Sequence, residues 1–189
     1  MATDAIRDDF EETFWIDSDI AFNPDDVERI RTHDLPICVG IYPKKGKREL
    51  AVHVLPGTRS ITFGQGGGVQ ELLDAGCGFM HVRRDAYEAI TRKLSLEICN
   101  IGFGRPLIPL FQPLVAQTSD GPWYLAEDFS FCERARQCGF QIMADSQIRL
   151  FHIGSYGYSW EEAGASPQRF TSYNFQVTQS QESKEPPDV

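Results

Sequence analysis

Two aspartates stand one residue apart directly after a short apolar run. The run, residues 13–16, is β-branched and aromatic and predicts a buried strand, and Asp17 and Asp19 follow it. In an open α/β sheet, ligands bind where such strands end, so both carboxylates would reach a binding edge. Two hard oxygen ligands suit Mg²⁺ or Mn²⁺, which would let an acidic protein hold a diphosphate. The spacing alone is a weak signal, because the same aspartates could cap the next turn.

Three further side chains could act with these aspartates. Glu127 and Asp128 open an apolar-faced helix, where acids complement the helix dipole. Held beside a binding site, one of the two could instead accept a proton from an incoming hydroxyl group. His152 lies late in an apolar run, where a lone histidine is more often a core residue than a ligand. Its neutral imidazole would nevertheless complete a metal site begun by Asp17 and Asp19.

Two other segments could contact a substrate. Trp123 and Tyr124 come just before the acidic pair, in a stretch rich in Pro and Gly, and could stack on an acceptor. The basic turn at residues 44–48 would ordinarily be a solvated hairpin, yet it could meet a phosphate or an anionic acceptor. The glycine-rich bend at residues 64–68 lacks the lysine and the spacing of a nucleotide P-loop.

Alternating strand and helix signals position these side chains. Asn23 predicts a helix N-cap just after the two aspartates, with Pro24 at the first helical position. Asp85 and Glu88 predict the capping box of a second helix. We expect strands at residues 13–16, 36–42, 49–55, 79–82, 140–144 and 148–153. Helices are expected at residues 24–33, from residue 85, and at residues 127–138. Residues 100–122 are expected to form a loop with one short strand near residues 107–111. This order predicts an α/β fold whose mixed sheet is flanked by helices.

Composition indicates one acidic domain with reduced thiols. The 189 residues carry 18 Lys and Arg against 27 Asp and Glu, a net charge of −9, which disfavours binding to nucleic acid. Five cysteines without C-x-x-C spacing do not suggest zinc or a disulfide framework. No run approaches the roughly 20 apolar residues of a membrane span, and residues 1–10 lack a signal core, so we expect a cytoplasmic protein. The domain is expected over residues 1–176, with a polar, disordered tail at 177–189.

Four segments, in this order, resemble the glycosyltransferases of the GT-A fold, in particular the family-2-like and phage-type members. The resemblance covers about residues 12–156, and four ordered motifs are more specific than any one of them. The segments are residues 14–20 with Asn23 and Pro24, residues 76–84, residues 126–135, and residues 139–140 with residues 145–154, which include His152.

The resemblance implies a metal-dependent enzyme that transfers a sugar from a nucleotide-sugar donor to a hydroxyl acceptor. In this reading Asp17 and Asp19 bind a Mn²⁺ or Mg²⁺ ion and the donor diphosphate, with Asp19 the more direct ligand. His152 is similar to the histidine that supplies a further metal ligand in the family. A metal that stabilises the leaving diphosphate would be chemically coherent with these donors.

The resemblance also implies the acceptor side of the site. Asp128 corresponds to the catalytic base of inverting members, while Glu127 would help to hold the acceptor. The segment Gly76, Cys77 and Gly78 resembles the loop beside the donor sugar, although cysteine stands where Thr or Ser is common.

One departure from the family is large. On the order of a hundred residues usually precede the two aspartates and bind the nucleotide, whereas sixteen precede Asp17 here. The sheet would then expose an edge at residues 13–16, which favours a second copy or a partner chain that supplies the missing half. Two alternatives therefore stand beside the transferase: a non-catalytic fragment or subunit that needs a partner for donor binding, and a metal-dependent phosphoryl hydrolase built on Asp17, Asp19, Glu127 and His152.

Overall fold

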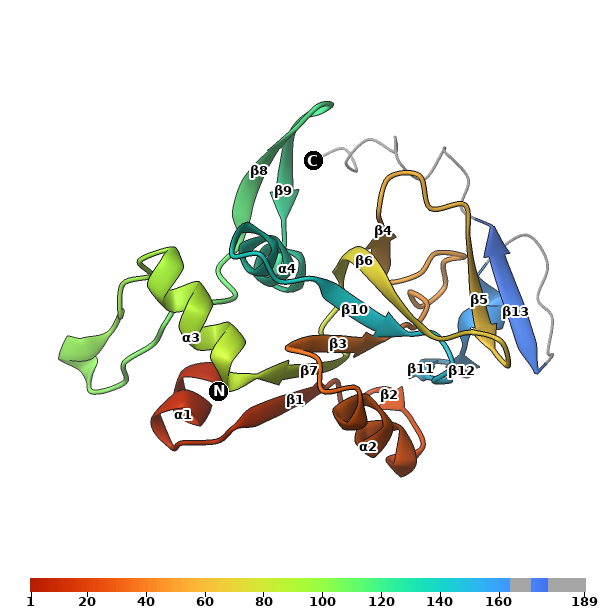
Figure 1. Ribbon diagram of the computed structural model, residues 1–189, viewed down its shortest axis with the longest axis horizontal. Helices are drawn as coiled ribbons and strands as arrows, with labels where there is room; N and C mark the ends of the chain where they lie inside the picture. Colours follow the sequence, from red (N-terminus) through yellow and green to blue (C-terminus); the bar gives the residue numbers. More distant parts are fainter. Residues whose placement is uncertain (164–170, 177–189) are drawn as a thin grey trace.

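The structure is a computed structural model that describes residues 1–163 and 171–176. Its architecture is α/β. A six-stranded mixed sheet lies between α3 (Arg84–Lys93) and α4 (Glu127–Gln137) on one face and α2 (Pro24–Thr32) on the other (Figure 1). The predicted class, a mixed sheet flanked by helices, is confirmed at this level. The tail expected at residues 177–189 lies outside the described residues.

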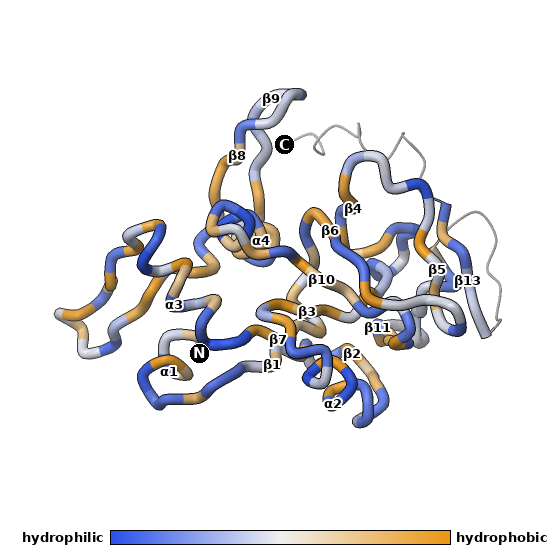
Figure 2. The backbone as a smooth tube through the Cα atoms, viewed as in Figure 1, coloured by the Kyte–Doolittle hydropathy of each residue, from blue (hydrophilic) through white to orange (hydrophobic). Residues whose placement is uncertain are grey.

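The large sheet has the order β1-β7-β3-β10-β6-β4, so β1 forms one of its edges. β3 and β10 run parallel, and the other neighbours run antiparallel. Apolar residues gather on the central strands (Figure 2), and all four residues of β3 are buried. The strands are β1 (Glu12–Ile16), β7 (Phe79–Arg83), β3 (Ile37–Gly40), β10 (Ile142–Asp145), β6 (Val69–Ala75) and β4 (Val52–Val54).

Smaller elements complete the described chain. A three-stranded sheet of β2, β11 and β12 joins the segment after the two aspartates to the strand that carries His152. These elements are β2 (Ile20–Ala21), β11 (Phe151–Ile153), β12 (Gly157–Tyr158), the pair β5 (Ser60–Gly64) and β13 (Ser172–Gln176), the hairpin β8 (Leu114–Thr118) and β9 (Gly121–Leu125), α1 (Ala2–Arg7), and the 3-10 turns η1 (Ile101–Phe103) and η2 (Trp160–Glu162).

Successive residues of β1 anchor it to both layers of the fold. The ring of Phe14 packs edge-on against Phe79 at a centroid distance of 4.7 Å, on the α2 side. The next residue, Trp15, faces the other layer, where its indole N–H donates to the phenol oxygen of Tyr87 at 2.8 Å. Because adjacent strand residues point to opposite faces, the strand is held from both sides. The position of Asp17, one residue beyond it, is fixed accordingly.

Local signals predicted α2 correctly. The Asn23 side chain accepts a hydrogen bond from the N–H of Asp25 at 3.1 Å, and Asp26 accepts one from the N–H of Asn23 at 3.0 Å. Pro24 stands at the first helical position, where its missing N–H costs nothing. α4 also spans the predicted residues, and Gly139 follows it with a φ of +84°.

The capping box predicted for the second helix was wrong. β7 runs directly into α3, whose N-cap is Arg83 and makes no side-chain capping bond. Asp85 therefore lies inside the first turn, where its carboxylate accepts the N–H of Ala86 at 2.9 Å. Glu88 pairs instead with Arg84, which donates to it at 2.6 Å.

The segment at 100–122 also differs from the prediction. Residues 107–111 form no strand beyond an isolated bridge between Leu107 and Cys99. The extended structure comes later, as the hairpin of β8 and β9 that projects beside α4 (Figure 1). Of the strand expected at 148–153, only its last three residues are extended and paired; Ile148 and Leu150 are buried in the apolar cluster on the α2 side.

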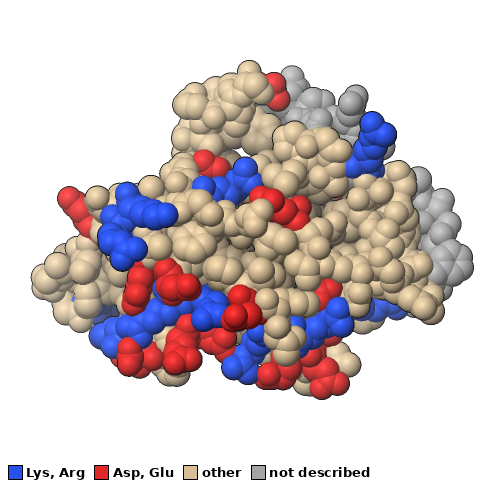
Figure 3. Space-filling view, in the orientation of Figure 1, with Lys and Arg blue, Asp and Glu red and all other residues tan. Residues whose placement is uncertain are grey.

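Figure 3 shows acidic and basic side chains interleaved along the lower part of this face, whereas its upper part is mostly uncharged. Ion pairs join Arg31 to Glu12 and Arg83 to Asp34. Basic side chains on the surface are therefore partly neutralised by nearby acidic side chains. Within the described ranges, every helix is too short or too polar to cross a bilayer.

Candidate functional site

Several of the predicted site residues lie near Tyr42, which follows β3. Its side chain is buried, and its phenol oxygen accepts a hydrogen bond from the N–H of Gly78 at 2.9 Å. A Cβ at either Gly76 or Gly78 would lie 2.5 Å from that oxygen, so the close approach requires glycine at both positions. Sequence reasoning missed Tyr42, because an aromatic residue in an apolar run signals only burial.

Asp17 lies against the same glycine segment. The antiparallel register of β1 and β7 continues beyond β1, and the N–H of Asp17 donates to the carbonyl oxygen of Gly78 at 3.1 Å. A Cβ at Gly78 would lie 2.9 Å from Asp17 Oδ2, which places the carboxylate beside this glycine. The structure therefore brings together the first aspartate and the segment from Gly76 to Gly78.

Asp19 and His152 meet through the pairing of β2 with β11. The N–H of Ile153 donates to the Asp19 carbonyl oxygen at 2.7 Å, and His152 Nε2 lies 3.7 Å from Asp19 Oδ1. His152 Nδ1 lies 2.9 Å from the carbonyl oxygen of Pro43. Because a carbonyl only accepts, Nδ1 donates its proton there, and in the neutral ring Nε2 keeps its lone pair toward Asp19.

A cationic side chain also faces Asp19. The ammonium group of Lys45 forms an ion pair with Asp19 Oδ2, and this hydrogen bond lowers the pKa of the carboxyl group. On the other side, the ring of His152 packs edge-on against Tyr42 at a centroid distance of 5.4 Å. The Asp19 pair and the Asp17 segment therefore share Tyr42 as a neighbour.

The side chains at this point fit a divalent cation in part. Carboxylate oxygen and imidazole nitrogen are suitable donors for Mn²⁺, and the Nδ1 bond to Pro43 is of the kind that orients metal-binding histidines. Among the residues that the structure describes, no three His, Cys, Asp or Glu side chains converge as a metal site. Asp19 and His152 are thus two adjacent potential metal ligands, and Asp17 does not join them as a third. The assignment of all three as metal ligands stays a prediction.

Glu127 and Asp128 open α4, and Asp128 lies close enough to Tyr42 for its charge to act on the phenol. Glu127 is exposed, whereas Asp128 is half-buried. Burial raises the pKa of Asp128, although the hydrogen bond from the N–H of Phe129 at 2.8 Å opposes this. Burial also raises the pKa of Tyr42, and the negative charges of Asp17 and Asp128 both add to that increase. The charges of Asp17 and Asp128 therefore both disfavour ionisation of the Tyr42 phenol.

The surroundings of Cys77 disfavour the thiolate form of its side chain. Burial raises the pKa of its thiol, and the carboxylates of Asp128 and Asp17 shift it in the same direction. Its sulfur lies 3.8 Å from that of Met80. A raised pKa lowers the fraction of thiolate, the form in which a cysteine acts as a nucleophile.

A histidine and a buried aspartate beside Asp128 were missed by the sequence analysis. His53 of β4 is joined to Asp74 of β6, with Nδ1 2.8 Å from Oδ1. The charge of Asp74 contributes to the raised pKa of Asp128. The His53 ring lies 4.8 Å from that of Phe129 and 6.3 Å from that of Trp123, between centroids. Trp123 thus lies near the acidic pair, and its role in stacking on an acceptor stays a prediction.

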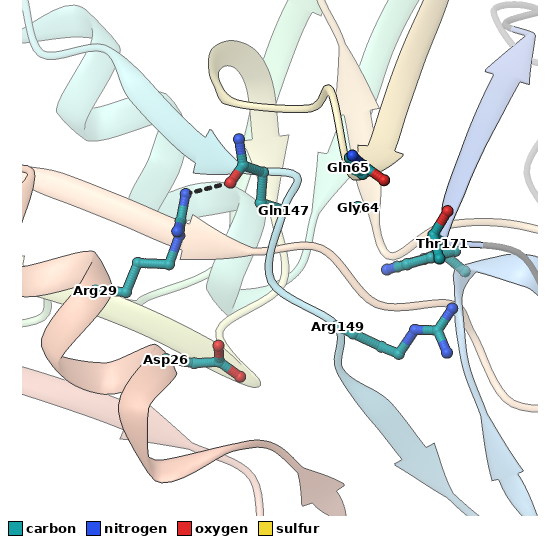
Figure 4. Close-up of a pocket in the computed structure, with 8 residues that line it drawn as sticks. Asp26, Arg29, Gly64, Gln65, Gln147, Arg149 and Thr171 are labelled. Carbon is teal, nitrogen blue, oxygen red and sulfur yellow. Dashed lines mark hydrogen bonds between the residues drawn. The ribbon is translucent and has the colours of Figure 1, made fainter.

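An open cavity of about 550 Å³ lies elsewhere, between α2, the segment after β10 and the end of β5 (Figure 4). Its described lining includes none of the predicted site residues. Arg29 donates to Gln147 Oε1 at 2.7 Å and to the buried Asp145 at 2.6 Å, and Arg149 lies 4.4 Å over the ring of Trp160. Through these bonds Arg29 joins α2 to the chain that leads to β11.

No family model and no curated protein matches this sequence. Among solved structures, the crystal structure of A197 from STIV is similar, with a TM-score of 0.51 and 16% sequence identity. The match covers 89% of this chain and 75% of that chain. At this identity the similarity is one of fold, and it agrees with the mixed α/β architecture described above.

Proposed function

We propose that this protein is a GT-A-like glycosyltransferase that moves a sugar from a nucleotide-sugar donor to a hydroxyl acceptor with the help of a divalent cation. One observation carries the proposal. Asp17, Asp128 and His152, from three separate segments, all lie around Tyr42. The segments that resemble the family are thus neighbours in space, as a shared site requires.

On the donor side, Asp19 and His152 would hold the cation, and the exposed Asp17 would help to bind the donor. A divalent cation bound there would supply the charge that stabilises a leaving diphosphate. Because Gly76 and Gly78 lack side chains, Tyr42 packs directly against this segment, which would lie beside Asp17 at the edge of the donor site.

On the acceptor side, Asp128 would accept the proton of the attacking hydroxyl group. Burial raises the pKa of this carboxyl group toward the working pH, which suits a general base. Glu127 stands next to it, exposed, where it could bind further hydroxyl groups of the acceptor. The half-buried ring of Trp123 would offer an apolar face to an acceptor sugar.

Calorimetry with Mn²⁺ and a panel of UDP- and GDP-sugars tests this proposal. We expect donor binding that Asp19→Asn weakens at least tenfold, together with transfer or slow donor hydrolysis that Asp128→Asn abolishes while donor binding remains. Release of phosphate from simple esters, without any affinity for nucleotide sugars, would contradict a transferase and favour the hydrolase.

The edge position of β1 favours a second candidate, a domain that binds the donor only with additional polypeptide. The N–H of Asp17 bonds to Gly78, just before β7. Because antiparallel bonds alternate along the pair, the backbone groups of Phe14 and Ile16 point away from β7. Such an edge can accept another strand. Mn²⁺ binding without affinity for any nucleotide sugar would support this candidate over the self-sufficient enzyme.

A further inference from the structure

A short basic turn lies over the Asp19 site. Its base is fixed: Pro43 and Leu50 form an isolated bridge, and the N–H of Lys44 donates to the carbonyl oxygen of Glu49 at 2.8 Å. Pro43 and Leu50 are buried, whereas the tip, residues 45–48, is exposed and reads Lys-Gly-Lys-Arg. The turn therefore presents cationic groups from an anchored base.

Lys45 is the residue of this tip that reaches Asp19. Its ammonium group pairs with Oδ2, while His152 Nε2 lies 3.7 Å from Oδ1. Its stem passes close to Gly154, since a Cβ there would lie 3.5 Å from Lys45 Cδ. The carboxylate of Asp19 is thus flanked by an ammonium group on one side and an imidazole on the other.

We propose that Lys45 takes the place of a divalent cation at Asp19 in the metal-free protein and moves onto the substrate phosphates when the cation binds. The inference rests on the proposed function, because it assumes that Asp19 and His152 hold a metal. An ammonium group and a divalent ion on one carboxylate repel each other strongly at contact distance. The flexible four-carbon stem of lysine allows the displacement, and a diphosphate offers the ammonium group a new partner.

This exchange makes binding of metal and diphosphate cooperative. A metal ion alone must break the ion pair of Lys45 with Asp19 and leave the ammonium group beside it. When a diphosphate is also present, the displaced ammonium group has a partner. Each ligand therefore strengthens the binding of the other, which is a coupling free energy between two ligands.

Titration with Mn²⁺ alone tests the first half of the exchange. Lys45→Met should bind Mn²⁺ about three- to fivefold more tightly than the wild type, the range expected when a competing exposed ion pair is removed. Lys47→Met removes the same charge from the same turn and is the matched control, with less than a twofold change. Unchanged or weaker Mn²⁺ binding in Lys45→Met overturns the proposal, and so does the absence of Mn²⁺ binding in both proteins.

Titration with inorganic pyrophosphate at saturating Mn²⁺ tests the second half. Here Lys45→Met should bind about fivefold more weakly than the wild type, and clearly more weakly than Lys47→Met. The two ligands thus respond in opposite directions to one substitution. A loss of stability in the variant would weaken both, so thermal unfolding of both variants is measured beside the titrations; a Lys45→Met variant that weakens both ligands contradicts the exchange.

The two proposals fail in different ways. Opposite responses to Mn²⁺ and pyrophosphate, in a protein that neither binds nor consumes nucleotide sugars, would retain the role of Lys45 and remove the glycosyltransferase. Nucleotide-sugar transfer with Lys45→Met indistinguishable from Lys47→Met would retain the enzyme and remove the role of Lys45.

Discussion

The phenol of Tyr42 accepts a hydrogen bond from the backbone N–H of Gly78 at 2.9 Å, although 36 residues separate them in the chain. The carbonyl group of the same glycine accepts the N–H of Asp17 at 3.1 Å. Gly78 is therefore bonded through its N–H to Tyr42 and through its carbonyl oxygen to the first aspartate. This arrangement fixes the position of Asp17 relative to Tyr42.

Tyr42→Phe should destabilise the protein by about 1–2 kcal/mol, because the buried N–H of Gly78 would lose its acceptor. The free energy of unfolding from urea denaturation measures this loss. Tyr124→Phe is the control: that side chain is 74% exposed, and its substitution should change stability by less than about 0.5 kcal/mol. Equal effects of the two substitutions would show that the Tyr42 bond contributes nothing to stability.

Gly78→Ala should cost about 1–3 kcal/mol, since the new methyl group would meet Tyr42 Oη at 2.5 Å and Asp17 Oδ2 at 2.9 Å. Both neighbours would have to move, so donor binding should weaken together with the melting temperature. Gly102→Ala serves as the control, because nothing lies within 4 Å of the position of its Cβ. A Gly78→Ala protein as stable as Gly102→Ala would contradict the close packing of this segment.

The elements that local signals specify could be predicted from the sequence. Residues 13–16 read as a strand because they are β-branched and aromatic, and Asn23 and Pro24 mark the start of α2 through capping alone. The predicted start of α3 failed because β7 continues into the helix without an intervening turn, which leaves Asp85 inside the first turn. The continuous chain from β7 into α3 thus sets the start of the helix, although Asp85 by itself favours an N-cap position.

Contacts of the site that depend on strand pairing could not be predicted. His53 and Asp74 are 21 residues apart and meet only because β4 pairs with β6, a strand the sequence did not reveal. Lys45 reaches Asp19 through the fold of its turn, whereas the sequence showed only a basic stretch. Residue types thus identified the segments with potentially reactive side chains. Which of these side chains contact one another depends on strand register and on the conformation of turns, which the sequence does not show.

Asp128→Asn should raise the stability of the protein at neutral pH and lower its transfer activity. Burial raises the folded-state pKa of Asp128 above 3.8, so the native state binds this proton more tightly and loses stability as pH rises through that window. The amide removes this penalty and still accepts the N–H of Phe129. We expect the variant to be more stable than the wild type at pH 7, with the difference vanishing below pH 3.8, while transfer falls at least a hundredfold.

Urea titrations at several pH values measure the stability of Asp128→Asn, with Glu127→Gln as the control at the neighbouring exposed position. The control should shift stability by less than about 0.5 kcal/mol at every pH. A variant less stable than the wild type at pH 7 would show that the carboxylate is stabilised by its surroundings, contrary to the direction given by its burial.

His152→Gln should abolish most Mn²⁺ affinity and leave the fold intact. The histidine donates Nδ1–H to the carbonyl oxygen of Pro43 and directs Nε2 toward Asp19, so its loss removes one of two adjacent donors. We expect Mn²⁺ binding to weaken at least tenfold, because metal-site affinity falls steeply even when only an orienting contact is lost. His53→Gln is the matched control, since that histidine bonds to Asp74 and lies near Trp123 rather than near Asp19. Calorimetry should show Mn²⁺ affinity within twofold of the wild type for His53→Gln; a larger loss there than in His152→Gln would place the cation beside Asp74 and Asp128 and move the metal-binding role away from Asp19.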